Sequence, residues 1–499
     1  MAERAERMAG VLMHPTSLPS EYGIGDMGKG AYDFVDFLAK AGQKLWQVLP
    51  LGPTGFGDSP YQLFSSFAGQ PLIISPDRLC EMGLLEESEL TDRPYFGERV
   101  DYGSVINYKN DLYRKAFSRF ILNEDEKIAG DYQQFIRSNA FWLEDYALYM
   151  SLKEVNEGRA WVEWQEEHKN PTAGAKEELS RRYCEKMDYY RFVQFIFFAQ
   201  WTGLKEYANE KGIQIIGDMP IFVAFDSADV WAAKDLFKLT DEGYPVVVAG
   251  VPPDYFSETG QLWGNPVYDW DIMRACSYDW WIKRIGQQFT LYDYVRIDHF
   301  RGFEAYWEIP YGEKTAINGR WVKGPGRELF LAMQNAIGES LPIIAEDLGV
   351  ITPEVEELRD AFGFPGMKVL QFAFDSDAMN PFLPHMCTEN SVCYTGTHDN
   401  DTTRGWYNNA SDYTRKHCAE YLRLGNDDIV WTMIAAALSS TARMAIIPFQ
   451  DLLGLDSSGR MNIPSVAGGN WSWRCGTEAF NDELASRLAG LTALYGRFH

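Results

Sequence analysis

DYVRIDHFR, residues 293–301, is a short apolar run into which Arg296, Asp298 and His299 are inserted. A strand buried on both faces would stay apolar, so these charged residues need an explanation of their own. Side chains alternate along a strand, and Arg296 and Asp298, two residues apart, therefore lie on one face. An arginine in that position can hold the aspartate in its charged form for chemistry. The spacing fits equally well an arginine that only neutralises a buried aspartate for folding.

Seven further runs of strand length are apolar and end in polar residues, which predicts parallel strands covered on both faces. They span residues 11–14, 45–50, 213–218, 343–347, 369–374, 392–399 and 444–451. Segments with helical periodicity, such as Ala31, Phe34, Val35 and Leu38, lie between them. Eight strands alternating with helices predict an α/β fold, a (β/α)₈ TIM barrel. A doubly wound open sheet is the alternative, but it would gather polar groups at one switch point and not at many strand ends.

The spacing of the runs predicts insertions into one catalytic barrel that spans residues 1–499. Residues 51–213, between the second and third strands, are too many for one crossover helix and are expected to form a mostly helical insertion. Residues 224–279 are rich in glycine, proline and aromatic residues, and we expect a loop that covers the active site. Both insertions are expected on the C-terminal side of the barrel.

Composition limits the partners. The formal net charge of −25 disfavours nucleic acid and anionic membranes, because such partners are bound through Lys and Arg. The seven cysteines are odd in number and form no C-x-x-C pair, which favours free thiols. Without a signal-like segment or a long apolar run, we expect a cytoplasmic protein. The 16 Trp, 27 Tyr and 30 Phe residues fit either a large core or flat platforms for sugar rings.

Carboxylates end four of the predicted strands, namely Asp218, Asp298, Glu346 and Asp399. In a barrel, these strand ends meet at the face that carries the active site. Several carboxylates together are typical of glycosidic chemistry, in which one is the nucleophile and another the acid/base. A metal hydrolase with His14, His398, Asp399 and Asp298 as ligands is the alternative. We expect no metal and no cofactor, since metal-ligand H-x-H and nucleotide-binding motifs are absent from the sequence.

Longer motifs resemble one known family. VRIDHFRGF at 295–303, AEDLG at 345–349 and GTHDNDTT at 396–403 are similar to the acidic motifs of amylomaltases, the 4-α-glucanotransferases of the α-amylase superfamily. HPTSLPSEYGIGDMG at 14–28, GPTGFGDSPYQ at 52–62, GDMPIFVAFDSADVWA at 217–232, PPDYFSETGQLWGNPVYDWD at 252–271 and RMNIPS at 460–465 extend the resemblance along the chain. It implies transfer of α-1,4-glucan segments between maltooligosaccharides or longer glucans by a retaining double displacement.

The resemblance also implies roles for individual residues. Asp298 would be the nucleophile, Glu346 the acid/base and Asp399 the stabiliser of the transition state. The implied sugar contacts are Arg296, His398, Asp218, Tyr61, Trp263, Asn462 and, on a flexible loop, Tyr255 and Phe256. Phe56 and Ser465 depart from the pattern, where Tyr and Gly are usual, and Phe56 puts a secondary glucan site in doubt. An α-glucan hydrolase with the same three acids and a non-catalytic glucan-binding protein remain as alternatives.

Overall fold

The computed structural model describes residues 6–122, 125–253, 257–466 and 468–498. Its main sheet has eight parallel strands in the order β10-β11-β12-β1-β2-β3-β6-β9. The strands are β1 (Met8–Leu12), β2 (Leu45–Gln47), β3 (Gln214–Pro220), β6 (Tyr294–Asp298), β9 (Ile343–Ala345), β10 (Gly366–Val369), β11 (Ser391–Tyr394) and β12 (Met444–Pro448). The edge strands are joined by a hydrogen bond from Ala345 N to Pro365 O at 2.9 Å. The prediction of a TIM barrel is confirmed.

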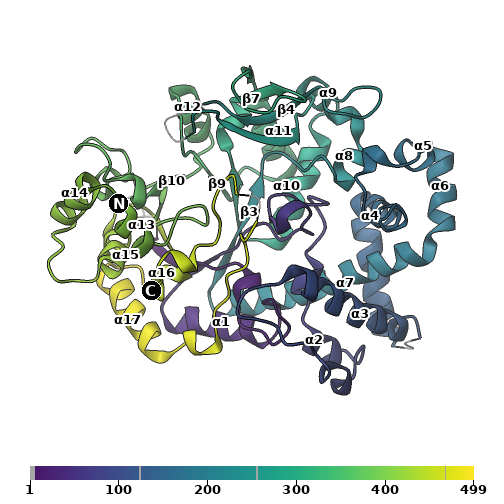
Figure 1. Ribbon diagram of the computed structural model, residues 1–499, viewed down its shortest axis with the longest axis horizontal. Coiled ribbons are helices and arrows are strands. Elements are labelled where there is room, and N and C mark those ends of the chain that lie inside the picture. Colours follow the sequence, from purple (N-terminus) through teal and green to yellow (C-terminus); the bar gives the residue numbers. More distant parts are fainter. Residues whose placement is uncertain (1–5, 123–124, 254–256, 467, 499) are drawn as a thin grey trace.

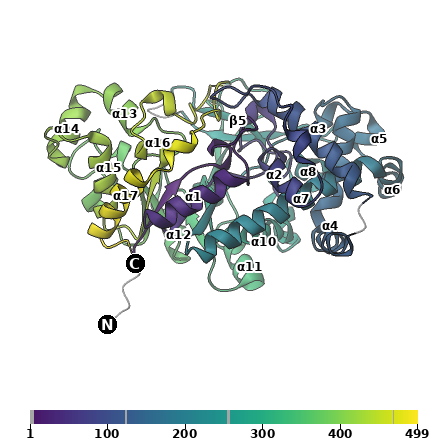
Figure 2. The ribbon, with the colours of Figure 1, turned by 90° about the horizontal axis from the view of Figure 1, so that it is seen from below.

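Amphipathic helices cover the barrel. Helix α1 (Lys29–Lys40) buries Ala31, Phe34, Val35 and Leu38, which is the apolar face that the periodicity predicts. Further helices between or after the barrel strands include α10 (Asp279–Leu291), α11 (Arg327–Ile337), α12 (Pro353–Ala361), α15 (Ile429–Ser439), α16 (Phe449–Leu452) and α17 (Asp482–Leu494). In Figure 2, α1 and α10 lie between the two ends of the molecule.

One strand begins earlier than predicted. The expected run 369–374 contributes only its first residue to β10, and Leu370–Phe372 form a 3₁₀ turn. The strand instead includes Lys368, whose ammonium lies 5.5 Å from the ring centre of Phe382. The aliphatic stem of a lysine can pack on apolar surface while its charged end reaches outward. Because Lys368 interrupts the apolar run, the sequence did not indicate where the strand begins.

The segment 51–213 contains mainly helices, and its assignment as a separate insertion stays a prediction. Its helices are α2 (Pro76–Glu81), α3 (Tyr102–Phe120), α4 (Glu126–Val155), α5 (Glu166–Lys169), α6 (Ala173–Arg182) and α7 (Cys184–Glu210). Figures 1 and 2 both place α3 to α6 at one end of the molecule, and α13 (Thr403–Asn409) and α14 (Asp412–Leu422) at the opposite end. Among the described helices, none has the length and apolar character needed to cross a bilayer.

The segment 224–279, expected as a loop, carries regular structure. Besides α8 (Ala228–Ala232) and α9 (Trp270–Ala275), it contains β4 (Val247–Val251) and β5 (Gln261–Pro266). Strand β4 pairs with β5 and with β7 (Ala305–Pro310), and β7 pairs with β8 (Arg320–Lys323), in an antiparallel sheet of order β5-β4-β7-β8. Strands β7 and β8 come from residues after Asp298, so no local pattern within 224–279 could indicate that β4 pairs with β7.

Candidate active site

Arg296 lies between two carboxylates at the C-terminal end of the barrel. Strands β3 and β6 pair with Asp218 opposite Arg296, which places an acid beside the arginine on the neighbouring strand. Arg296 Nη1 donates to both oxygens of Asp218 at 2.7 Å, and Nη2 donates to Asp298 Oδ1 at 2.9 Å. Burial opposes the charge on Arg296, but the two carboxylates outweigh it and raise the pKa of the guanidinium well above its usual value. Arg296 thus pairs with Asp298, as their spacing suggests, and also binds Asp218, so that it bridges the two carboxylates.

Tyr61 and Trp263 approach this bridge from segments outside the barrel strands. Tyr61, in the loop after β2, donates its hydroxyl to Asp218 Oδ2 at 2.8 Å. Trp263 on β5 packs edge-on against His299, with ring centres 4.8 Å apart. The antiparallel sheet therefore delivers an aromatic side chain to the residue that follows Asp298.

Glu346 directly follows β9 and is held by backbone donors. The N–H of His299 donates to Oε2 and the N–H of Leu348 donates to Oε1, both at 2.7 Å. Burial and the nearby charge of Asp298 raise the pKa of Glu346 to about 7, although Arg296 and the two N–H groups oppose the shift. A carboxyl group that keeps its proton near neutrality can act as a general acid.

Asp399, in the loop after β11, is contacted by two side chains that can donate hydrogen bonds. Asn462 Nδ2 donates to Asp399 Oδ1 at 2.6 Å, and His398 Nε2 lies 3.4 Å from Oδ2. Burial alone would raise the pKa of Asp399, but His398, Asn462 and Arg296 lower it below the usual value. Conversely, burial disfavours charge on His398, but Asp399 raises the pKa of the imidazole above its usual value. Asp399 is therefore an ionised group in this site.

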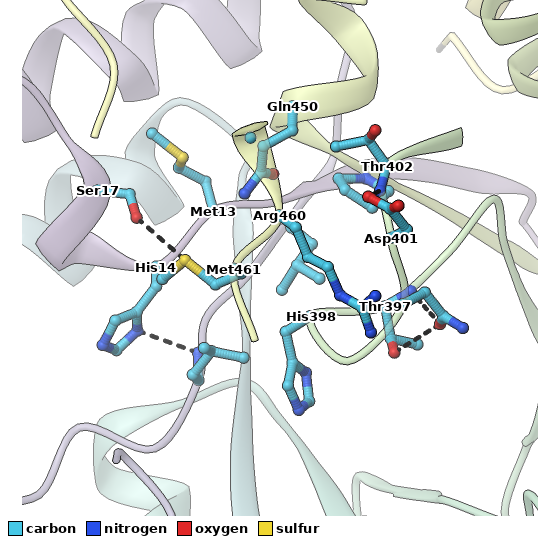
Figure 3. A pocket seen from close by; sticks show the side chains of 15 residues that line it. Met13, His14, Ser17, Thr397, His398, Asp401, Thr402, Gln450, Arg460 and Met461 are labelled. Carbon is cyan, nitrogen blue, oxygen red and sulfur yellow. Dashed lines mark hydrogen bonds between the residues drawn. The ribbon is translucent and has the colours of Figure 1, made fainter. Parts of the chain in front are cut away.

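A small cavity of about 30 Å³ is lined in part by His398 (Figure 3). Its lining includes His14 after β1, Thr397 and His398 after β11, and Arg460 and Met461 from a C-terminal loop. Of the three acids, none lines it. His14 Nδ1 accepts a hydrogen bond from Leu49 N at 3.3 Å, and burial lowers the pKa of His14 to about 3. Among the described residues, no group of three or more His, Cys, Asp or Glu has a metal-binding arrangement.

Most of the predicted site residues meet in one place. Asp218, Arg296, Asp298 and Tyr61 form one hydrogen-bonded group, and His398, Asp399 and Asn462 form another. The ring of Tyr61 stacks on that of His398 at 5.1 Å and joins the two groups. Tyr255 and Phe256 lie outside the described residues. Phe56 is 80% exposed, and the secondary glucan site stays an open prediction.

Two residues of the site had no predicted role. His299 adopts a left-handed conformation with φ of 51° and presents its N–H to Glu346. Trp471 packs against both Tyr61 and His398, at 6.0 Å and 5.9 Å between ring centres. The only local signal for Trp471 is a Gly-Gly-Asn turn before it, at 468–470.

Known proteins are similar to this chain in sequence and in fold. The sequence pattern of the 4-alpha-glucanotransferase family matches residues 13–478. The 4-alpha-glucanotransferase of Synechocystis sp. is 52% identical over 99% of this chain and 98% of its own length, and that of Thermus thermophilus is 48% identical over 97% and 98%. The amylomaltase from Streptococcus agalactiae, solved in complex with acarbose, is 41% identical and superimposes with a TM-score of 0.95, covering 99% of this chain and 100% of its own. The chain belongs to the 4-alpha-glucanotransferase family.

Proposed function

We propose that the protein is a 4-alpha-glucanotransferase that moves a segment of an α-1,4-glucan to the 4-hydroxyl of another glucan or of glucose, with Asp298, Glu346 and Asp399 as its catalytic residues. Family membership and about 50% identity to named enzymes over the full length support the activity. The observation that carries the assignment of roles is the contrast between two neighbouring acids. Arg296 pairs with Asp298, while burial keeps a proton on Glu346 up to about pH 7.

The first half-reaction forms a glycosyl-enzyme. Glu346 gives its proton to the glycosidic oxygen as the bond to the anomeric carbon breaks, and an oxygen of Asp298 bonds to that carbon. The shorter glucan leaves with the transferred proton. Asp399, ionised and oriented by Asn462 and His398, can accept hydrogen bonds from sugar hydroxyls and stabilise the positive charge that develops on the ring.

The second half-reaction transfers the glycosyl group. Glu346, now a carboxylate stabilised by the N–H groups of His299 and Leu348, takes the proton of the acceptor hydroxyl. The acceptor oxygen bonds to the anomeric carbon, and the bond to Asp298 breaks. Two displacements on the same carbon retain its configuration. An acceptor sugar held in place has a high effective concentration, which favours it over water.

Incubation with maltotriose, followed by thin-layer chromatography, tests this proposal. Transfer yields glucose together with products longer than maltotriose. Hydrolysis by the same three acids would only shorten the chains, and a product pattern without longer oligosaccharides would replace transfer by hydrolysis. A glucan-binding protein without activity would leave maltotriose unchanged. EDTA should leave the rate unaffected, whereas complete loss on chelation would support the metal hydrolase.

The compartment is a separate proposal. All seven cysteines are free thiols, which fits a reducing compartment, and we propose the cytoplasm. Cell fractionation tests this, and recovery of the protein outside the cytoplasmic fraction would contradict it.

A further inference from the structure

Three rings from distant parts of the chain meet beside the carboxylates. Tyr61 follows β2, His398 follows β11, and Trp471 precedes α17. The ring centres of Tyr61 and His398 are 5.1 Å apart, and Trp471 lies 6.0 Å from the first and 5.9 Å from the second. Each ring therefore contacts both others. Tyr61 and His398 also reach the carboxylates of Asp218 and Asp399, whereas Trp471 packs on the rings of Tyr61 and His398.

The backbone of Trp471 is held in a conformation that large residues rarely adopt. Its φ is +60°, in the left-handed region, where a bulky side chain is strained by about 1 kcal/mol or more. Two hydrogen bonds fix this conformation. Trp471 N donates to Met461 O at 2.8 Å, and the hydroxyl of Tyr102 donates to Trp471 O at 3.0 Å. Strain that is held by surrounding contacts is concentrated at functional sites.

The segment that leads into α3 holds the same turn. Val100 N donates to Ser472 O at 2.8 Å, next to the bond between Tyr102 and Trp471. Trp471 itself is only 5% exposed. The indole is thus a rigid support, anchored by a helix of the 51–213 segment on one side and by the Arg460–Met461 loop on the other.

We propose that Trp471 is a positioning residue of the catalytic centre, whose indole holds the rings of Tyr61 and His398 in the orientation that contacts Asp218 and Asp399. This inference rests on the proposed glucanotransferase chemistry. Tyr61 and His398 are the two side chains that join the Asp218–Arg296–Asp298 group to Asp399. Without the indole, both rings gain room to rotate and the two groups lose their common support. Misplacement of contact groups by about 1 Å costs on the order of 100-fold in rate.

A double-mutant cycle on kcat/KM with maltotriose tests the inference. Trp471→Ala alone is expected to lower kcat/KM on the order of 100-fold. In a Tyr61→Ala background the same change should cost much less, because the ring that Trp471 supports is already gone. A purely structural tryptophan would give equal losses in both backgrounds, and that result would overturn the proposal. So would activity of Trp471→Ala within about 3-fold of wild type, since a support worth on the order of 100-fold would then be missing.

Trp164 provides the matched control. It is also 5% exposed and also packs against two rings, those of Tyr149 at 5.3 Å and Trp231 at 6.3 Å, but it lies in the 51–213 segment. Trp164→Ala should lower the melting temperature without changing kcat/KM per folded molecule. In the Tyr61→Ala background it should likewise leave kcat/KM unchanged, so that the two effects add. If Trp471→Ala does not fold, Trp471→Leu keeps apolar volume and can carry the cycle. Trp471→Phe, which restores a ring, should recover most of the activity.

Failure of the proposed function and failure of this inference are distinguishable. If the wild-type protein forms no product longer than maltotriose, that result contradicts the proposed function alone. The orientation of the rings can be followed without substrate, because a protonated imidazole quenches a neighbouring indole. The fluorescence difference between wild type and Trp471→Phe should change with pH, and it should not change in a His398→Gln background. A difference that is independent of pH in both would contradict the contact.

Discussion

The N–H of His299 donates a hydrogen bond of 2.7 Å to Oε2 of Glu346. His299 directly follows Asp298, so the peptide after the proposed nucleophile holds the proposed acid/base. The left-handed conformation of His299 also lets the next residue, Phe300, donate its N–H to the carbonyl oxygen of Glu346 at 3.1 Å. A displacement of either acid is therefore transmitted to the other, which fits two groups that must act on one glycosidic bond.

Asp298→Ala should abolish transfer, because the anomeric carbon has no other nucleophile in its place. The measurement is kcat/KM on maltotriose with purified, folded protein. Asp293→Ala is the matched control, since Asp293 precedes the same strand at its opposite end and accepts a hydrogen bond from Ile215 N at 2.7 Å. The control should lose stability and keep activity. Wild-type turnover by Asp298→Ala would remove Asp298 from the nucleophile role.

Glu346→Gln should slow transfer from maltotriose by several orders of magnitude but should have less effect on a maltosyl fluoride donor. The fluoride leaves without protonation, so the first step no longer needs the acid. Initial rates with the two donors give the comparison. Equal losses on both would contradict the acid/base assignment.

The activity should fall at alkaline pH. Burial and Asp298 raise the pKa of Glu346 to about 7, and the first step requires the protonated form, so kcat/KM should decrease as pH rises through about 7. The raised pKa of Glu346 also makes the stability of the folded protein depend on pH. Because the folded pKa lies above the unfolded value, the folded protein loses stability as pH rises from about 4.5 to about 7. A kcat/KM that stays constant to pH 9 would contradict the assignment.

Arg296→Lys should lower kcat/KM on the order of 100-fold, because one ammonium cannot bridge two carboxylates as the planar guanidinium does. Arg296→Met leaves the buried Asp218 without a cationic partner and should cost about 3 to 5 kcal/mol in urea unfolding. Arg274 is the matched control. It also binds two carboxylates, Asp271 at 2.9 Å and Glu328 at 2.7 Å, but it is 49% exposed. Arg274→Met should cost less than about 1 kcal/mol, and equal losses at the two sites would refute the special role of the buried bridge.

Ser465→Gly should stabilise the protein slightly. Ser465 is exposed and has a φ of +65°, in the region that glycine adopts without strain. Relief of that strain is worth more free energy than the unfolded chain gains from the added conformational entropy of glycine. We therefore expect the free energy of unfolding in urea to rise by about 0.5 kcal/mol. Ser138→Gly, inside helix α4, should instead lose about 0.5 kcal/mol. A loss at both positions would show that the turn needs the serine side chain.

The barrel was predictable because its strands are short apolar runs, and the apolar character of a run is a local property of the sequence. The start of β10 was not, since Lys368 interrupts the pattern and is accommodated only by packing on Phe382. The sheet of β4, β5, β7 and β8 was missed for another reason. Its two halves are joined by the pairing of β4 with β7 across Asp298, and pairing between distant segments leaves no trace in the periodicity of either.

The sequence by itself determined the eight-strand pattern and the carboxylates at the strand ends, because an apolar run and the residue that ends it are local features. It also placed Arg296 and Asp298 on one face, because side chains alternate along a strand. The family motifs then assigned roles to Asp298, Glu346 and Asp399. Only the tertiary structure decided that Arg296 also binds Asp218, that backbone N–H groups hold Glu346, and that Trp471 stands behind Tyr61 and His398. These contacts join residues far apart in the chain, and burial, which sets the pKa of Glu346, exists only after the chain has folded.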